Sequence, residues 1–279
     1  TLTQGKIRFF GFDNQRQGII DVPKAKITKA RFALQGRYFF FSGHNKLFVY
    51  DLKQQSLKKQ GFHGETIKAY LLCARAQRVV VQLLDNKIIQ SFNFDLQQKH
   101  TYYLPIERGT KLDRDITTTG LSRDGKTLYV GNSSGQVFLM GSRTNDIQDT
   151  VVAGKFAVRQ VLTNFQDSLW ISSMESKKVS VWQGTKHLYD LKGLDAPAHT
   201  IGIMHRTQSI VALTKRNTLL LWDHNGQLYY QKKLTDLRLG QIRLGPGAIW
   251  LYDKDGMLLK IIPKPPYQQK FRQRGYVLM

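Results

Sequence analysis

Apolar residues, polar residues and glycine turns alternate most regularly in residues 121–140, LSRDGKTLYVGNSSGQVFLM. Residues 127–131 are β-branched and aromatic and follow the pair Asp124-Gly125, so they predict a strand entered through a tight turn. A second turn of the same kind is expected at residues 132–135. Residues 137–140 are too few for a helix and are apolar on both faces, which is typical of a strand between packed sheets. The stretch therefore predicts three antiparallel strands.

The same pattern recurs along the whole chain. A bulky apolar residue ends the third strand of each unit, and the spacings between these marker residues are 40, 42, 48, 42, 40 and 40 residues. The markers are Phe10, Tyr50, Phe92, Met140, Trp182, Trp222 and Ile262. A period near forty residues with four strands in each unit is the period of a β-propeller blade.

Two markers are followed directly by aspartate, Tyr50 in LFVYDL and Trp222 in LLLWDH. On these residues, on SRDGKTLYVGNSSGQVFLM and on residues 214–234, TKRNTLLLWDHNGQLYYQKKL, the chain resembles the WD-repeat and YVTN-like β-propeller superfamily. The resemblance covers most of the sequence and is one of fold. It implies an all-β propeller of four-stranded antiparallel blades.

The repeats predict seven blades, or six if the N-terminal strands complete the last blade. The segments KIRFFGFD and QGIIDV near the N-terminus are expected to be the third and outer strands of a repeat that lacks its first two strands. Pairing of the N- and C-terminal strands is then expected to close the ring. We expect residues 1–279 to form a single propeller domain, with residues 263–279 as a basic segment rich in proline and aromatic residues.

Positive charge is the second strong signal in the sequence. The chain has 42 lysines and arginines against 20 aspartates and glutamates, a net charge of +22 and a pI near 10.1. A field of this size attracts polyanions, whether RNA, DNA, anionic lipid headgroups or an acidic protein. The alternative interpretation is a surplus that serves solubility alone.

Two basic clusters are candidate binding sites for a partner or a polyanion. The first lies in VPKAKITKAR, in the expected connection between two blades, and comprises Lys24, Lys26, Lys29 and Arg31. The second lies in the C-terminal segment, among tyrosines and phenylalanine, and comprises Lys264, Lys270, Arg272 and Arg274. An extended basic segment with aromatic residues can follow a phosphate backbone and stack on unpaired bases. The same segment could instead supply the last outer strand of the ring.

Residues with catalytic or metal-binding chemistry are few and scattered. Cys73 lies in an apolar strand, AYLLCARA, and is expected to be a small buried hydrophobe. Glu107, Asp113 and Asp115 could act as an acid and base or bind a metal, but neighbouring basic residues favour ion pairs in a loop. The sequence DKDG at residues 253–256 resembles the start of a calcium loop and is better explained as a hairpin turn.

Trp170, Trp182 and Trp222 are expected to pack between blades rather than to form a ligand cage. Because no set of metal or cofactor ligands stands out, we expect no cofactor and no metal site.

The sequence thus predicts a non-catalytic interaction scaffold, a basic propeller that binds an acidic partner, most simply a protein within a larger assembly. A propeller that binds RNA or DNA directly, or a component of a ribonucleoprotein, is the first alternative. An enzyme with an active site in the central channel is the second. No apolar run is long enough to span a membrane. A cytoplasmic location is expected, or an exported or periplasmic one if a signal peptide was removed before Thr1.

Overall fold

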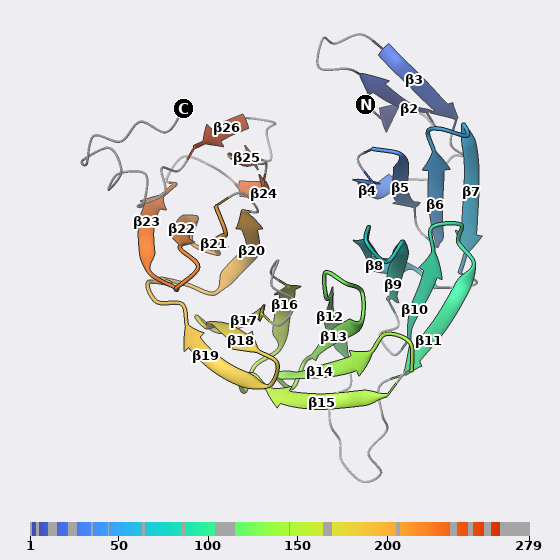
Figure 1. Ribbon diagram of the computed structural model, residues 1–279. Helices are drawn as coiled ribbons and strands as arrows, with labels where there is room; N and C mark the ends of the chain where they lie inside the picture. The colour runs from blue at the N-terminus through green and yellow to red at the C-terminus, as the bar shows by residue number, and fades with distance from the viewer. Residues whose placement is uncertain are drawn as a thin grey trace, which may run out of the picture. The chain divides into compact units, whose positions relative to one another are not determined.

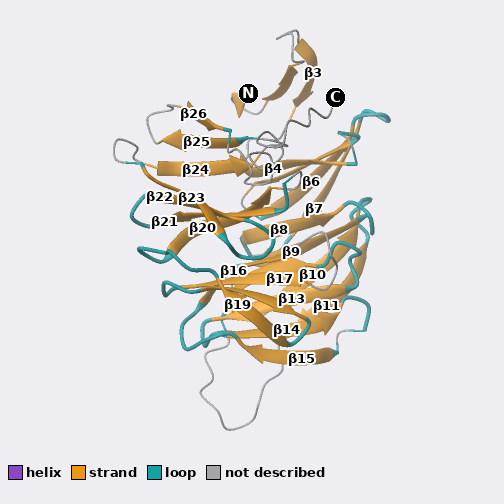
Figure 2. Ribbon diagram, turned by 60° about the vertical axis from the view of Figure 1, so that its left-hand side comes forward, coloured by secondary structure: helices purple, strands orange, loops and turns teal. Residues whose placement is uncertain are grey.

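The computed structural model shows a chain built from β-strands. The residues that it describes are 2–3, 6–10, 16–21, 27–34, 36–43, 45–62, 65–84, 88–103, 115–144, 146–163, 169–204, 207–234, 239–244, 248–253 and 258–262. All regular secondary structure in these ranges is strand (Figure 2). The strands form five four-stranded and two three-stranded antiparallel sheets. The all-β prediction is confirmed.

The chain divides into two compact units, Thr1–Tyr103 and Leu104–Met279. The first unit contains three sheets, and in each the strands follow one another in chain order (Figure 1). The strands are β1 (Leu2–Thr3), β2 (Lys6–Phe10), β3 (Arg16–Asp21), β4 (Ile27–Ala33), β5 (Tyr38–Gly43), β6 (Lys46–Asp51), β7 (Ser56–Gly61), β8 (Ile67–Cys73), β9 (Arg78–Leu83), β10 (Ile88–Asn93) and β11 (Gln98–Tyr103). The three sheets are β1–β3, β4–β7 and β8–β11.

The second unit contains four sheets with the same order of strands. Its strands are β12 (Ile116–Leu121), β13 (Thr127–Asn132), β14 (Gln136–Gly141), β15 (Ile147–Val152), β16 (Val158–Thr163), β17 (Leu169–Met174), β18 (Val179–Gln183), β19 (Lys186–Asp190), β20 (Ala198–Met204), β21 (Ser209–Thr214), β22 (Thr218–Trp222), β23 (Leu228–Lys233), β24 (Leu239–Leu244), β25 (Ile249–Asp253) and β26 (Leu258–Ile261). They form sheets β12–β15, β16–β19, β20–β23 and β24–β26.

Residues 121–140, in which the repeat is clearest, form the predicted hairpins. β13 pairs with β12 and β14, and Gly125 and Gly135 occupy the two turns with φ angles of 71° and 85°. Glycine suits these positions because side chains disfavour positive φ. The three predicted strands and both turns are confirmed.

The second and third strands of each four-stranded sheet carry the core. All six residues of β21 and all five of β22 are buried, whereas every residue of β23 is at least partly exposed. A strand that packs on both faces must be apolar on both faces, which explains the continuous apolar runs. The fourth strands are more polar because they lie at the sheet edge, where they contact solvent.

Five of the seven markers lie in the third strand of a four-stranded sheet, as predicted. They are Tyr50, Phe92, Met140, Trp182 and Trp222. Phe10 ends β2, and Ile262 directly follows β26 and is exposed. The repeat in the sequence therefore corresponds to the repeated sheet in the structure.

The two ends of the described chain differ from the expectation in one detail. β2 pairs with the short strand β1 as well as with β3, so the first repeat has part of a preceding strand. β1–β3 and β24–β26 are separate three-stranded sheets in the described residues. Closure by the terminal strands, the blade number and the single domain stay predictions.

Candidate interaction surface

Lys29 and Arg31 of the first basic cluster lie within strand β4 rather than in the connection between blades where the cluster was expected. They are two residues apart and therefore on one face of the strand. Both residues are exposed. The Lys29 ammonium donates a hydrogen bond to the main-chain carbonyl oxygen of Lys68 on β8, over 3.0 Å. Partial burial of the ammonium and the charge of Arg31 lower the pKa of Lys29. The structure thus gives Lys29 a role in joining two sheets, while binding of a polyanion by Lys29 and Arg31 stays a prediction.

The remaining residues of the two basic clusters lie outside the described residues. They are Lys24, Lys26, Lys264, Lys270, Arg272 and Arg274. Their role in binding stays a prediction that rests on the sequence alone.

The bond made by Lys29 has counterparts in the second unit. Thr163 on β16 donates from its hydroxyl to the carbonyl oxygen of Leu121 on β12 over 2.8 Å. The side-chain amide oxygen of Gln160, also on β16, accepts from the main-chain N–H of Ile201 on β20 over 2.7 Å. In every case a side chain on the first strand of one sheet bonds the main chain of the first strand of another sheet. Sequence reasoning missed this role, although the partners lie 39, 42 and 41 residues apart, close to the repeat period.

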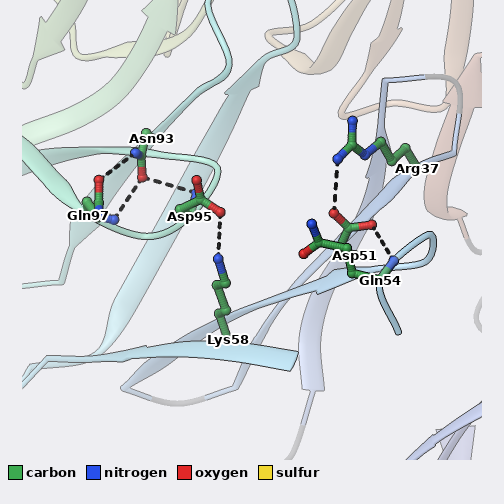
Figure 3. Close-up of polar contacts among 7 residues, drawn as sticks. All are labelled: Arg37, Asp51, Gln54, Lys58, Asn93, Asp95 and Gln97. Carbon is green, nitrogen blue, oxygen red and sulfur yellow. Dashed lines mark hydrogen bonds and ion pairs between the residues drawn. The ribbon is translucent and has the colours of Figure 1, made fainter. Parts of the chain in front are cut away.

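Lysines on β7 lie at an exposed sheet edge, where they discourage pairing with another strand. Lys58 and Lys59 are exposed on β7, whereas Lys53 lies in the turn that precedes this strand. The Lys58 ammonium lies 2.6 Å from a carboxylate oxygen of Asp95 in the next sheet (Figure 3). Solvent screens an exposed ion pair of this kind, so it contributes little to stability. Lys58 therefore already has an ion-pair partner within the protein.

The aspartate that follows the marker Tyr50 has a structural role. One carboxylate oxygen of Asp51 accepts a hydrogen bond from the main-chain N–H of Lys53 at 2.9 Å. The same oxygen accepts from the N–H of Gln54 at 3.1 Å, and the other oxygen lies 3.3 Å from the Arg37 guanidinium (Figure 3). Burial acts to raise the pKa of Asp51, but these hydrogen bonds and Arg37 outweigh it and lower the pKa. Asp51 thus fixes the turn that leads into β7.

Two further residues at the equivalent position act in the same way. The side-chain oxygen of Asn93 accepts from the N–H groups of Asp95 and Gln97 (Figure 3). Asp223 accepts from the N–H groups of Asn225 and Gln227 at 2.9 Å. The aspartates on which the family resemblance rests are therefore turn residues.

Ser180, His187 and Asp190 come together on β18 and β19, a grouping that the sequence reasoning did not find. One oxygen of Asp190 accepts from the Ser180 hydroxyl at 2.6 Å and lies 2.8 Å from Nε2 of His187. In a catalytic triad the histidine lies between the serine and the carboxylate. Here the carboxylate lies between the other two, so Asp190 orients both and the serine is not activated by this bond.

The other candidates for chemistry lie apart. Cys73 is buried and the three tryptophans pack inside the protein, as predicted. Asp115 is exposed, Glu107 and Asp113 lie outside the described residues, and Asp253 ends β25 with residues 254–257 outside them. Within the described part of the chain, no three His, Cys, Asp or Glu side chains are grouped to hold a metal ion.

No helix in the ranges that the structure describes has the length and apolar character needed to cross a membrane.

Comparison with known proteins shows the fold. No family model and no curated protein matches the sequence. A chain of the Mitotic Checkpoint Complex matches with a TM-score of 0.75 and 12% identity, over 94% of this chain and 82% of that chain. The β-propeller domain of Myceliophteria thermophila Cps50 (Swd1) matches with a TM-score of 0.77 and 11% identity, over 94% of this chain and 91% of that one. The predicted resemblance to WD-repeat β-propellers is confirmed at the level of fold.

Proposed function

We propose that this protein is a non-catalytic interaction scaffold, a basic propeller that binds an acidic protein within a larger assembly. The observation that carries the proposal is the combination of a propeller-like fold with a net charge of +22. With 42 basic and 20 acidic side chains, most basic residues have no carboxylate to neutralise them. Such a surface attracts and orients an acidic partner.

The proposal includes the finer features of the fold. The seven sheets are the blades of one closed propeller domain, and the terminal segments complete the first and last blades. Their three-stranded form supports this, because each has room for one more strand in a four-stranded blade.

Isolation of the tagged protein from its own cells, with and without nuclease treatment, tests the proposal. The expected result is an acidic protein recovered in a fixed ratio with both treatments. Loss of every partner after nuclease digestion would instead support the alternative of a nucleic-acid-binding propeller. Recovery of the protein alone under both conditions would leave the positive charge as a solubility feature and overturn the scaffold proposal.

A further inference from the structure

Two large apolar side chains are exposed at the end of β15 and in the short connection from β15 to β16. Val152, the last residue of β15, is 69% exposed, and Phe156 is 57% exposed. Single exposed apolar residues are ordinary, but here two of them flank one turn, around Gly135. Val152 is paired with Gln136 next to that turn, and the main-chain oxygen of Phe156 lies against Gly135.

The backbone that carries Phe156 is held in place. The N–H groups of Ala153 and Gly154 both donate to the carbonyl oxygen of Gly135, at 2.9 and 3.3 Å. On the other side of Phe156, the carbonyl oxygen of Ala157 accepts from the N–H of Glu175 at 3.0 Å. The connection is therefore fixed at both ends, and the phenylalanine is presented to solvent from an ordered backbone. Preorganisation of this kind lowers the entropic cost of binding.

Contacts around Gly135 explain why this turn can lie so close to the connection between β15 and β16. A side-chain carbon at Gly135 would collide with the carbonyl oxygen of Gly154 and lie 2.8 Å from that of Phe156. Only glycine leaves room for the two main-chain bonds, and its φ of 85° also favours glycine. The backbone from which the exposed side chain of Phe156 extends is therefore packed closely on this turn.

Basic side chains near the two apolar residues outnumber the exposed carboxylate of Asp115, whose main-chain oxygen accepts from Ser133 in the same turn. Lys155 lies between the two apolar residues in the chain, and Lys177 lies two residues beyond Glu175, which bonds the connection. Both lysines are exposed, and neither forms a hydrogen bond or ion pair with the parts of the chain that the structure describes. The carboxylate of Glu175 is neutralised by the Arg159 guanidinium at 2.7 Å. Exposed apolar side chains with exposed lysines nearby are complementary to an acidic segment that carries a bulky apolar side chain.

We propose that Val152 and Phe156, with Lys155 and Lys177, form a docking site for an acidic peptide segment of a partner protein. The proposal rests on the scaffold function above and names the surface that performs it. Binding to RNA without sequence preference calls for stacked aromatic rings along a basic groove. Here one aromatic ring is paired with an aliphatic side chain, which cannot stack on a base, so the surface favours a protein partner.

A labelled peptide of the sequence DEDFLEDE tests the site by fluorescence anisotropy at physiological salt. Two matched peptides separate the two contributions, one with Asn and Gln in place of the acids and one with Ser in place of Phe and Leu. We expect both to bind at least about tenfold more weakly than DEDFLEDE, because each lacks one of the two complementary features. Equal binding of all three peptides would overturn the proposal.

Protein variants locate the site. Phe156→Ser and Lys155→Ser each weaken binding of DEDFLEDE, the first by about tenfold. Leu84→Ser and Lys186→Ser, which change an exposed apolar residue and an exposed lysine elsewhere, leave it unchanged. Circular dichroism and thermal unfolding show that the variants fold. Equal effects of the site and control variants would assign binding to overall charge and overturn the proposal, as would tighter binding of oligouridine that depends on Phe156.

The same variants distinguish failure of the docking site from failure of the scaffold function. If tagged Phe156→Ser still recovers the nuclease-resistant acidic partner in full, the docking site is wrong while the scaffold proposal stands. If wild type recovers no protein partner, the scaffold proposal itself fails.

Discussion

Trp170 and Trp182 stack across two neighbouring strands, with ring centroids 5.3 Å apart and ring planes 11° from parallel. They are directly opposite each other in the ladder between β17 and β18, and both are buried. The indole nitrogen of Trp170 donates to the carbonyl oxygen of Gly184 and that of Trp182 to the Ser172 hydroxyl, so neither polar group is left unsatisfied. The two tryptophans therefore contribute both ring packing and hydrogen bonds to the core of the second unit.

Replacement of Trp170 by alanine is therefore expected to be severe. Loss of the stacked ring leaves a cavity, and the free energy of unfolding falls by about 3–5 kcal/mol. Urea denaturation followed by circular dichroism measures it. Trp170→Phe keeps an aromatic ring and should cost less. A loss no larger for alanine than for phenylalanine would contradict the packing role.

Gly131 on β13 is expected to tolerate no side chain. An added Cβ would lie 2.8 Å from Cγ2 of Thr118 and 2.9 Å from Cβ of Val158. Gly131→Ala should thus lower the free energy of unfolding by about 1–3 kcal/mol through overpacking. Gly61→Ala is the matched control, because nothing lies within 4 Å of a Cβ there. A similar melting temperature for the two variants would show that β13 does not pack as described.

Two substitutions separate the roles of Asp51, which accepts hydrogen bonds from the turn and pairs with Arg37. Asp51→Asn keeps an oxygen that can accept from the turn, as Asn93 does at the equivalent position, and loses only the charge pairing with the half-exposed Arg37. Its expected cost is below about 1 kcal/mol. Asp51→Ala leaves the N–H groups of Lys53 and Gln54 without their acceptor and should cost about 1–3 kcal/mol. Thermal unfolding compares the two, and equal costs would contradict the turn role.

Asp195 should make stability depend on pH. Burial acts to raise the pKa of Asp195, but hydrogen bonds from Thr218 and Thr214 and the charge of Lys233 outweigh it and lower the pKa. A lowered pKa in the folded state stabilises the protein above the unfolded pKa of about 3.9, and this contribution is lost as the pH falls through the folded pKa.

The stability difference between wild type and Asp195→Asn should consequently be largest near neutral pH and shrink below about pH 4. Urea denaturation of both proteins across this pH range provides the measurement. A difference that stays constant down to acid pH would show that the ionised carboxylate is not what stabilises this site.

The repeating sheets could be predicted from the sequence because their signal is local. Turn glycines such as Gly125 and apolar runs such as that of β22 specify a hairpin and a buried strand from neighbouring residues alone. The spacing of the markers then gives the number of sheets. Contacts between sheets carry no such signal, which is why the bond from Lys29 to the main chain of Lys68 was not foreseen.

The candidate site was harder to predict for a related reason. Phe156 and Val152 look like ordinary strand or core residues in the sequence, and their exposure depends on how residues 153–157 pack on the turn at Gly135. Lysine clusters, by contrast, are visible in the sequence. The sequence does not show which of their ammonium groups form bonds within the protein. Lys29 illustrates this, since it was predicted as a binding residue and is bonded to main chain.

The central claim, that the basic surface binds an acidic protein, is tested most directly by zero-length cross-linking of the native, nuclease-treated assembly. A carbodiimide activates a carboxylate, and the deprotonated amine of a lysine in contact with it then displaces a urea to form an amide. The account predicts amide links, found by mass spectrometry, between lysines of this chain and aspartates or glutamates of a second protein, with Lys155 and Lys177 among them. Ultraviolet cross-links to RNA in untreated assemblies, with no carbodiimide link to any protein, would contradict it.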